Sequence, residues 1–354
     1  MSKAKDMKNE NHVALYRKYR PSAFAEVIGQ DHIVKAIKGA LDQGKASHAY
    51  LLCGPRGTGK TTIARIIASE LGTSVNDVYE MDAASNRGIN EARDIRENIR
   101  TLPFDSKYKV YILDEVHMFT KDAWNALLKT IEEPPEHVVF ILATTELEKV
   151  PETIVSRCQT FIFKKPTDII LAEVVKNTAK KEGYSFEEGG AELLALLGDG
   201  SFRDAQSILD KVISYAKDKK ISLEDITEVT GAPESTLVRD FISALAEADI
   251  ERGYTAVRTA SAQNIDMKVY IKIILSYLRY ALMLRYAPSM KKHMADTLSA
   301  SDLAYLEAIV QDKPEHISSR TLSTLLSAYQ SQRHSFISEL PLELALVHIF
   351  DGSK

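Results

Sequence analysis

A glycine-rich loop between an apolar strand and a helix constrains this chain more than any other feature. The run Gly54-Pro55-Arg56-Gly57-Thr58-Gly59-Lys60-Thr61 fits the pattern G-x-x-x-x-G-K-[ST]. It follows the apolar segment 49–52 and opens a helical pattern at Thr61. In that setting, backbone N–H groups and the positive end of the helix form a cavity for phosphate groups. The loop predicts a nucleoside triphosphate site; a glycine-rich turn with a chance lysine is the alternative.

The loop also predicts individual roles. Lys60 would contact the β- and γ-phosphates, and the Thr61 hydroxyl would ligate Mg²⁺. The residues expected to bind the nucleotide here are Gly54, Pro55, Gly57, Thr58, Gly59, Lys60, Thr61 and Thr62.

A second apolar run, 110–113, ends in the carboxylates Asp114 and Glu115. In the same sheet as a phosphate loop, such a pair is typical of a hydrolytic site. Asp114 would hold hydrated Mg²⁺ through water, and Glu115 would polarise the attacking water as general base. A single carboxylate could instead be a cap. The pair predicts hydrolysis rather than binding alone.

Three further residues could act on the γ-phosphate. Thr145 ends the apolar run 139–143 and could orient the attacking water if that strand neighbours the one before Asp114. Arg157 is either a surface residue or a charge-stabilising arginine of phosphoryl transfer. Arg203, at the start of a helix, could report on the γ-phosphate from a lid.

Short β-rich runs alternate with helical patterns from residue 49 to residue 163, as a parallel α/β sheet requires. The expected strands are 49–52, 78–81, 110–113, 138–143 and 160–163. The expected helices between them are 61–71, 90–101 and 121–133. After residue 163 the strand pattern stops and the rest is predicted to be helical, with a second break at Gly231-Ala232-Pro233.

Composition narrows the class of protein. A length of 354 residues predicts two or three domains. Two cysteines, Cys53 and Cys158, can form neither a disulfide framework nor a four-cysteine zinc site. Residues 1–11 are too polar for a signal peptide, and the apolar window 267–286 carries four Lys or Arg side chains, so we expect a cytoplasmic protein. A net charge of −4 leaves nucleic-acid contacts to a local patch.

The order and spacing of these motifs resemble the AAA+ ATPases of the clamp-loader group. The stretches Tyr-Arg-Lys-Tyr-Arg-Pro (16–21), Asp-Ala-Ala-Ser (82–85) and the long run 125–137 are similar to the tau/gamma subunits of bacterial DNA polymerase III. The likeness is dense from residue 15 to about 210 and architectural beyond Gly231. It implies an α/β P-loop AAA+ core at 1–165, a helical lid at 166–231 and an all-α collar at 232–354, which in the family forms a pentamer.

The resemblance implies a motor subunit that uses ATP and Mg²⁺ to open a ring-shaped sliding clamp and close it around primer-template DNA. The implied partners are delta- and delta-prime-like subunits, further copies of this chain, the clamp and the DNA, with no membrane. Carried over, Lys60 and Thr61 match Walker A, Asp114 and Glu115 Walker B, Thr145 sensor 1, Arg157 the trans-acting arginine finger and Arg203 sensor 2. The adenine pocket of the family is matched by Arg20, Pro21, Val27 and Ile28.

The chain departs from the family in one place. Tau/gamma subunits usually carry a four-cysteine zinc module between Walker A and the Asp-Ala-Ala-Ser segment, whereas here residues 71–77 join the two directly. No zinc is therefore expected, and the subfamily could be a divergent bacterial or phage one. The long tau tail is also missing, so the chain is expected to be either gamma-like or a longer chain cut after the collar.

Three arginines, Arg93, Arg96 and Arg100, fall on one stripe of the expected helix 90–101. Acidic residues at 91, 94 and 97 make a salt-bridged surface helix the alternative that the residues alone favour. Because this part of each module faces DNA in clamp loaders, the resemblance implies that these arginines and Arg87 bind phosphates without reading bases.

Two apolar segments are compatible with either a core or an interface. Met118, Phe119 and Trp124 could touch the clamp, or Trp124 could be buried. The apolar face of the helix 267–286 packs in a core or forms a partner interface.

The chain as a whole is also compatible with functions besides that of a clamp-loader motor. These are an AAA+ motor acting on DNA recombination junctions, a non-catalytic clamp-loader scaffold, and a nucleotide-gated regulator without DNA. The intact phosphate loop and the carboxylate pair argue against the scaffold.

Overall fold

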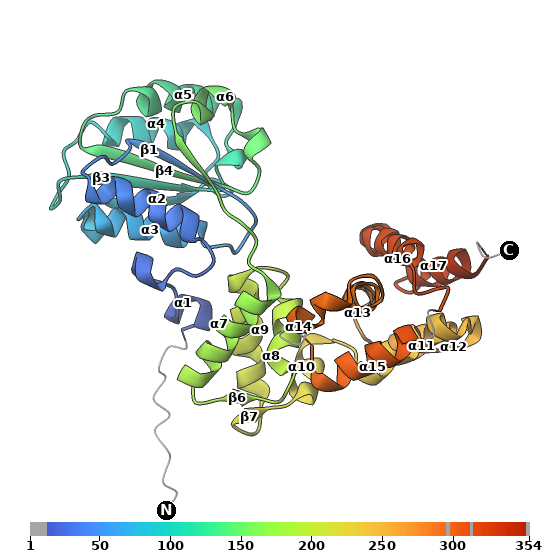
Figure 1. The fold of residues 1–354 in the computed structure, drawn as a ribbon. Helices are drawn as coiled ribbons and strands as arrows, with labels where there is room; N and C mark the ends of the chain where they lie inside the picture. The colour runs from blue at the N-terminus through green and yellow to red at the C-terminus, as the bar shows by residue number, and fades with distance from the viewer. Residues whose placement is uncertain (1–12, 295–297, 312–313, 352–354) are drawn as a thin grey trace, which may run out of the picture. The chain divides into compact units, whose positions relative to one another are not determined.

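The computed structural model describes residues 13–294, 298–311 and 314–351. These residues form two compact units (Figure 1). The first contains residues 13–170 and 200–204, and the second contains residues 171–199 and 205–351. Every residue predicted to bind or hydrolyse a nucleotide belongs to the first unit.

The first unit is built on a parallel sheet of five strands. Their order across the sheet is β2-β3-β4-β1-β5, so β4 lies between β1 and β3. The strands are β1 (Ala49–Cys53), β2 (Val78–Asp82), β3 (Lys109–Asp114), β4 (Val138–Thr144) and β5 (Gln159–Ile162). All five predicted strands are confirmed to within one residue at each end.

Helices cover both faces of this sheet, which explains why its central strands are mostly apolar. Tyr50 and Leu52 point to the face covered by α2 and α3, while Ala49 and Leu51 point to the face covered by α4, α5 and α6 (Figure 1). The alternation follows from the two-residue repeat of a strand. The helices are α2 (Asp31–Asp42), α3 (Lys60–Glu70), α4 (Ile89–Asn98), α5 (Lys121–Glu132) and α6 (Glu152–Val155).

Helix α4 ends at Asn98, so the predicted helix 90–101 is wrong at its C-terminal end and Arg100 lies outside the helix. The Asn98 carbonyl oxygen accepts from the Thr101 hydroxyl at 2.7 Å and from the ammonium of Lys109 at 3.0 Å. Lys109 is only 3% exposed and reaches this point from β3. These bonds satisfy a terminal carbonyl without a further helical turn.

Short helices connect the elements of the first unit. They are α1 (Leu15–Lys18), η1 (Phe24–Glu26), η2 (Val75–Asp77), η3 (Val116–Met118) and η4 (Leu147–Lys149).

The second unit begins with four helices and a small sheet. The expectation that strands stop after residue 163 is wrong here, because β6 pairs with β7 in parallel. Each strand has two residues, which is too short for an alternating pattern to appear in the sequence. The elements are α7 (Asp168–Lys181), β6 (Ser185–Phe186), α8 (Gly190–Leu197), α9 (Phe202–Tyr215), β7 (Lys220–Ile221) and α10 (Leu223–Thr230); α7 and α9 start within the first unit.

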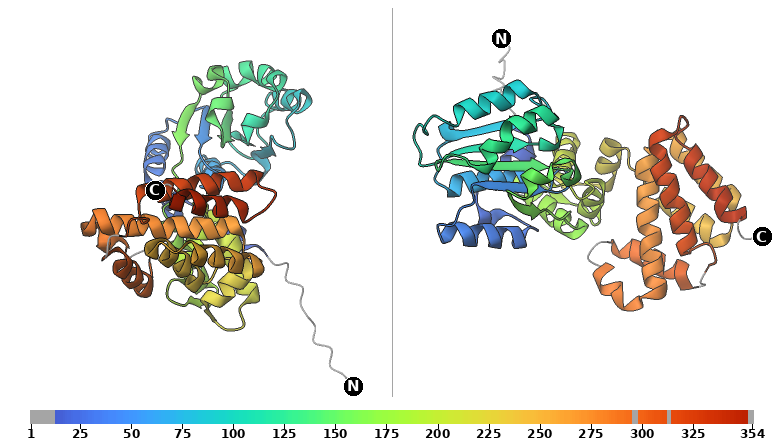
Figure 2. Two further views of the ribbon diagram at one scale, coloured as in Figure 1. Left: turned by 90° about the vertical axis from the view of Figure 1, so that its right-hand side faces the viewer. Right: turned by 90° about the horizontal axis from the view of Figure 1, so that it is seen from above.

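The remaining helices surround α13 (Met267–Tyr286), which packs against α11, α15 and α16 (Figure 2). Gly231 ends α10 with a φ of 66°, as the predicted break requires. The helices around α13 are α11 (Ser235–Glu247), α12 (Ile250–Ala262), η5 (Pro288–Met290), α14 (Lys291–Met294), α15 (Ala300–Gln311), α16 (Ser319–Ser331), η6 (Gln332–His334) and α17 (Leu340–Asp351).

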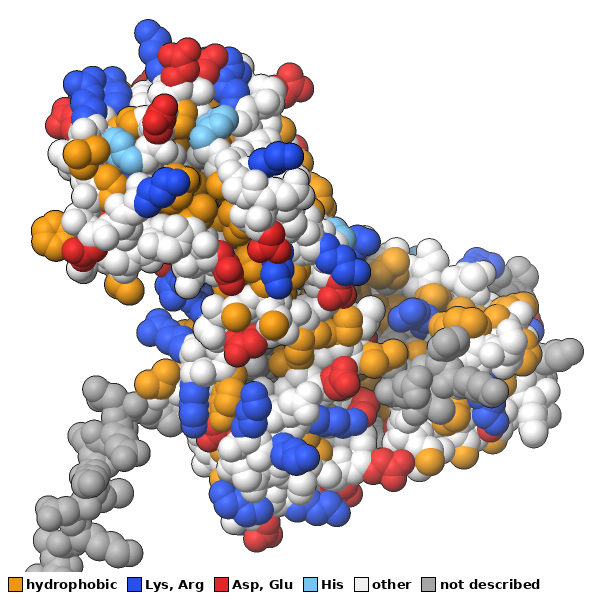
Figure 3. Space-filling view, turned by 60° about the vertical axis from the view of Figure 1, so that its left-hand side comes forward, with side chains coloured by type: hydrophobic (Ala, Val, Ile, Leu, Met, Phe, Trp, Pro, Cys, Tyr) orange, Lys and Arg blue, Asp and Glu red, His pale blue; other side chains and the backbone are white. Residues whose placement is uncertain are grey.

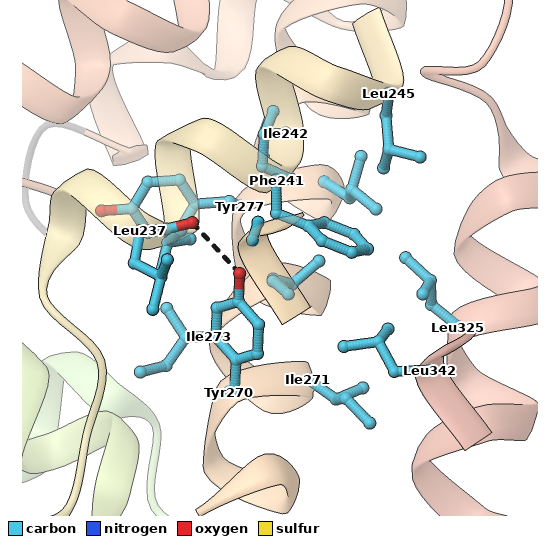
Figure 4. Packing of buried hydrophobic residues seen from close by; sticks show 14 of the residues in the cluster. Leu237, Phe241, Ile242, Leu245, Tyr270, Ile271, Ile273, Tyr277, Leu325 and Leu342 are labelled. Carbon is cyan, nitrogen blue, oxygen red and sulfur yellow. Dashed lines mark hydrogen bonds between the residues drawn. The ribbon is translucent and has the colours of Figure 1, made fainter. Parts of the chain in front are cut away.

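The apolar face of α13 is core, which decides between the two interpretations of this helix. Ile271, Ile274 and Leu278 are each 0% exposed. Tyr270 is equally buried, and its hydroxyl donates to the Leu237 carbonyl at 3.1 Å, so the polar end of the ring is satisfied (Figure 4). Within the described ranges, no helix is both long and apolar enough to cross a membrane.

Candidate functional site

The phosphate-binding loop lies between β1 and α3, as predicted. Gly57 has a φ of 72°, and a Cβ atom there would collide with Oγ of Ser201, so only glycine fits. None of the described residues accepts a hydrogen bond from the N–H groups of Gly59, Lys60 or Thr61. These groups, at the positive end of α3, can bind the oxygens of a phosphate group.

The rest of the loop is held by its own hydrogen bonds. The N–H of Gly54 donates to the Thr144 carbonyl at 3.1 Å, which ties the end of β1 to the end of β4. The Thr58 hydroxyl, 1% exposed, donates to the Pro55 carbonyl at 2.8 Å. Thr62 is half-buried in the first turn of α3.

Lys60 brings a buried cation to the loop. Its side chain is 5% exposed, and Nζ donates to the carbonyl oxygens of Gly54 at 2.8 Å and Pro55 at 2.9 Å. Burial lowers the pKa of Lys60, while the carboxylates of Glu115 and Asp114 oppose that shift. A partly desolvated ammonium attracts an anion more strongly than one in bulk water.

Thr61 and Asp114 meet although they are far apart in the sequence. The Thr61 hydroxyl donates to Oδ2 of Asp114 at 2.6 Å. β1 and β3 both run parallel to β4, so the loop after β1 and the carboxylates after β3 emerge at the same edge of the sheet. A hydroxyl and a carboxylate are the hard oxygen ligands that Mg²⁺ prefers, so the donor set fits the predicted ion.

Glu115 and Thr145 also meet, as the prediction requires. Strand β4 neighbours β3, and the Thr145 hydroxyl donates to Oε2 of Glu115 at 3.2 Å. Glu115 has a left-handed backbone with a φ of 51°. For a residue with a Cβ atom this conformation is uncommon and occurs often at functional sites. It turns the chain sharply after Asp114, whose Oδ1 accepts from the N–H of Glu115 at 2.9 Å.

Arg203 stands beside the loop at the start of α9. The N–H of Phe202 donates to the Gly57 carbonyl at 3.0 Å, which ties residues 200–204 of the first unit to the phosphate loop. The guanidinium of Arg203 lies 4.9 Å from the centre of the Tyr16 ring and hydrogen-bonds the Tyr16 hydroxyl. Sequence reasoning missed Tyr16, because an aromatic residue in a basic stretch carries no catalytic pattern.

The segment predicted to line an adenine pocket lies near the same place. Arg20 is half-buried, and its pKa is lowered by burial and then by the nearby Arg65 guanidinium. Val27 packs on the apolar cluster between the sheet and helices α2 and α3, whereas Ile28 is 46% exposed. The next residue, Gly29, faces Ile170 and Phe202. Pro21 is half-buried between Arg20 and η1.

Arg157 lies away from the residues around Lys60. It precedes β5 and is therefore at the amino end of the sheet, opposite the edge where the phosphate loop follows β1. Its guanidinium donates to the Thr153 carbonyl and to a Glu132 carboxylate oxygen, both at 2.7 Å. The buried Nε of Arg157 has no partner among the described residues.

The proposed DNA-binding arginines are exposed. Arg87, Arg93, Arg96 and Arg100 are all exposed, and among the described residues none of them forms an ion pair with a carboxylate. On the face shown in Figure 3, Lys and Arg side chains mix with Asp and Glu and form no single large basic patch.

The two rings of Phe119 and Trp124 are buried in an edge-to-face pair, 5.3 Å between centres, and Met118 is exposed.

Models of known families match most of the chain. Residues 72–167 match the model described as DNA polymerase III, delta subunit, and residues 171–218 match the DNA polymerase III clamp loader subunit, ATPase lid domain. Residues 221–353 match DNA polymerase III subunits gamma and tau domain III. Residues 23–111 also match magnesium chelatase, subunit ChlI.

Curated relatives carry related descriptions. The chain is 41% identical over 299 residues to DNA polymerase III subunit tau of Bacillus subtilis, covering 78% of this chain and 53% of that one. It is 36% identical over 299 residues to DNA polymerase III subunit gamma of Buchnera aphidicola, covering 78% of this chain and 82% of that one. The chain thus spans about half the length of the tau relative.

Among solved structures, the RuvB Holliday junction branch migration motor of Thermotoga maritima is similar, with a TM-score of 0.52 and 26% identity over 65% of this chain and 80% of RuvB. The five-stranded parallel sheet, its covering helices, the lid match and the helical C-terminal part confirm the predicted α/β P-loop AAA+ architecture.

Proposed function

Since this chain belongs to the gamma and tau family of DNA polymerase III subunits, we propose that it is the ATP-hydrolysing motor of a clamp loader, which opens a sliding clamp and places it on primer-template DNA. The hydrogen bond of 2.6 Å between Thr61 and Asp114 carries the proposal, because it joins the phosphate loop to the carboxylates needed for hydrolysis.

ATP binding is assigned to the loop and its surroundings. The N–H groups of the loop and the ammonium of Lys60 bind the phosphates, and Arg203 contacts the γ-phosphate. Arg20, Pro21, Val27 and Ile28 line the adenine. The position of Gly29 against Phe202, beside Arg203, supports a pocket that spans both segments.

Hydrolysis is assigned to the carboxylate pair. Glu115 accepts a proton from the attacking water, and Thr145 orients the carboxylate and the water. Thr61 and, through water, Asp114 would hold Mg²⁺, which supplies Lewis-acid charge neutralisation on the phosphates. No zinc is proposed; in the described residues no group of three or more His, Cys, Asp or Glu side chains is placed to hold a metal ion.

Arg157 is proposed to act on the site of a neighbouring subunit. Its location at the amino end of the sheet, away from Lys60, supports a role in trans. Such an arginine stabilises charge that develops on the γ-phosphate in the transition state.

The chain is proposed to have three parts: a core at 1–165, a lid at 166–231 and a collar at 232–354 that forms a pentamer with further copies and with delta- and delta-prime-like subunits. The separate matches to a lid domain at 171–218 and to domain III at 221–353 support the second boundary.

A motor for recombination junctions is the second candidate, because the RuvB structure shares the fold. The matches to gamma and tau domain III favour the clamp loader, since they cover the part that lies beyond the shared ATPase fold.

ATPase assays on the reconstituted assembly test the proposal. Hydrolysis should rise when sliding clamp and primed DNA are added together, and Glu115→Gln should abolish multiple-turnover hydrolysis while ATP affinity is kept. Stimulation by a four-way junction alone would instead identify a junction motor. Absence of ATP binding would leave the non-catalytic scaffold, and loss of binding in Glu115→Gln would mark a structural carboxylate.

A further inference from the structure

A second side chain besides Thr145 lies beside the carboxylate of Glu115. Nδ1 of His117 lies 3.5 Å from Oε2 of Glu115, the same oxygen that accepts from the Thr145 hydroxyl at 3.2 Å. The side chain of His117 is only 8% exposed. It belongs to η3, the short helix that follows the left-handed turn at Glu115.

The hydrogen bonds of Thr144 are compatible with a proton on Nδ1 of His117. The Thr144 hydroxyl donates to the Glu146 carbonyl at 3.2 Å and accepts from the Glu146 N–H at 3.0 Å. Nδ1 of His117 lies 3.1 Å from the same hydroxyl oxygen. When the Thr144 hydroxyl donates to the Glu146 carbonyl, Nδ1 of His117 is the donor in this contact, because a hydroxyl has one proton to give. In that arrangement the Nδ1–H faces both Thr144 and Glu115.

The other ring nitrogen faces a second carboxylate. Nε2 of His117 lies 3.4 Å from Oε1 of Glu146, and Oε2 of Glu146 pairs with Lys149 at 2.8 Å. The hydrogen bond from Lys149 holds the pKa of Glu146 below its usual range, with a smaller contribution from His117. The imidazole thus connects Glu115 to an ion pair at the rim, where both side chains are partly exposed.

We propose that His117 is a positioning residue for the general base: its Nδ1–H fixes Oε2 of Glu115 and leaves Oε1 for the attacking water. This inference rests on the proposed hydrolytic function. This role explains why the buried His117 lies between two carboxylates. Its imidazole ring connects Glu115, the proposed base, to the ion pair of Glu146 and Lys149.

Two isosteric variants separate the ring nitrogens. The amide of His117→Asn can place a donor where Nδ1 lies, and the amide of His117→Gln can place one where Nε2 lies. Both remove the ring, and the two variants differ from one another by a single methylene group. In the reconstituted assembly, we expect kcat to stay within about threefold of wild type for His117→Asn. It should fall about tenfold or more for His117→Gln and His117→Ala, with ATP affinity unchanged in all three.

A double-mutant comparison tests whether His117 acts through Glu115. In the Glu115→Gln background, His117→Ala should not lower the residual single-turnover rate further. The inference would be overturned if His117→Ala lowered the rate of hydrolysis by the same factor in both backgrounds. It would also be overturned if His117→Asn hydrolysed ATP no faster than His117→Gln. In either case, ATPase activity of the wild type would still support the proposed motor function. A wild type that binds but never hydrolyses ATP would overturn the motor as well.

Discussion

The guanidinium of Arg203 lies 4.9 Å from the centre of the Tyr16 ring, which joins the start of α9 to α1 near the N-terminus. The Tyr16 hydroxyl also accepts hydrogen bonds from Arg17, at 3.2 Å, and from Arg203, and these bonds lower its pKa. Tyr16 thus limits the orientations of the arginine proposed to contact the γ-phosphate.

Removing the Tyr16 ring should weaken ATP binding selectively. An exposed cation–π contact contributes about 0.5–1 kcal/mol, so Tyr16→Ala should raise the Kd for ATP about two- to fivefold. The Kd for ADP, which has no γ-phosphate, should not change. Tyr16→Phe, which keeps the ring and loses the hydroxyl, is the matched control and should lie closer to wild type. Equal weakening of ATP and ADP binding would contradict a role through Arg203.

Arg157 should matter only in the assembly. Arg157→Ala should leave ATP affinity of the isolated chain unchanged and lower the ATPase rate of the assembled complex by about 100-fold or more. Glu132→Gln removes the charge that Arg157 pairs with but keeps the arginine, so this variant should lose less ATPase activity than Arg157→Ala. Full ATPase activity of the Arg157→Ala complex would exclude Arg157 as the arginine finger.

The exposed arginines of α4 should bind DNA through phosphates. The double variant Arg93→Ala/Arg96→Ala should weaken binding of the assembly to primed DNA and make the slope of log K against log salt less steep by about 1.5–2. Lys180→Ala/Arg258→Ala removes two exposed cations from the helical unit and serves as the control. A slope equal to that of wild type would rule out these contacts.

Asp77 should make the stability of the first unit depend on pH. Burial raises the pKa of Asp77, but its hydrogen bonds with the N–H groups of Phe104, Asp105 and Ser106 outweigh burial and hold the pKa below its ordinary value of 3.8. The stabilisation is complete above that value and is lost as the pH falls through the lowered pKa. Asp77→Asn should therefore unfold at a lower midpoint denaturant concentration than the wild type at pH 7. This difference in midpoint should become smaller below about pH 4. A difference in midpoint that stays constant with pH would show that the charge of Asp77 does not contribute to stability.

Local patterns were enough to predict the sheet and the phosphate loop. Strands β1, β3 and β4 are apolar over most of their length, and Lys60 and Thr61 stand directly between a strand and a helix. Because β1 and β3 are both parallel to β4, the meeting of Thr61 with Asp114 also follows once the strand order is known.

The two-residue strands β6 and β7 and the end of α4 could not be predicted in this way. Pairing of Ser185 with Lys220 depends on a long-range contact, and α4 stops at Asn98, whose carbonyl oxygen accepts from the distant Lys109. Neither event leaves a periodic signal in the residues concerned.

The sequence by itself determined the proposed chemistry of this protein: a phosphate loop, a carboxylate pair and the arginines proposed to serve phosphoryl transfer, since these depend on residue type and short spacing. Only the tertiary structure decided which other side chains contact these residues and orient them. His117, which follows β3, lies close to Glu115 and to Thr144 and Glu146 at the end of β4, and Tyr16 contacts Arg203, which lies far along the chain. Such contacts depend on packing between segments far apart in the chain, where rotamers and burial, rather than spacing, set the geometry.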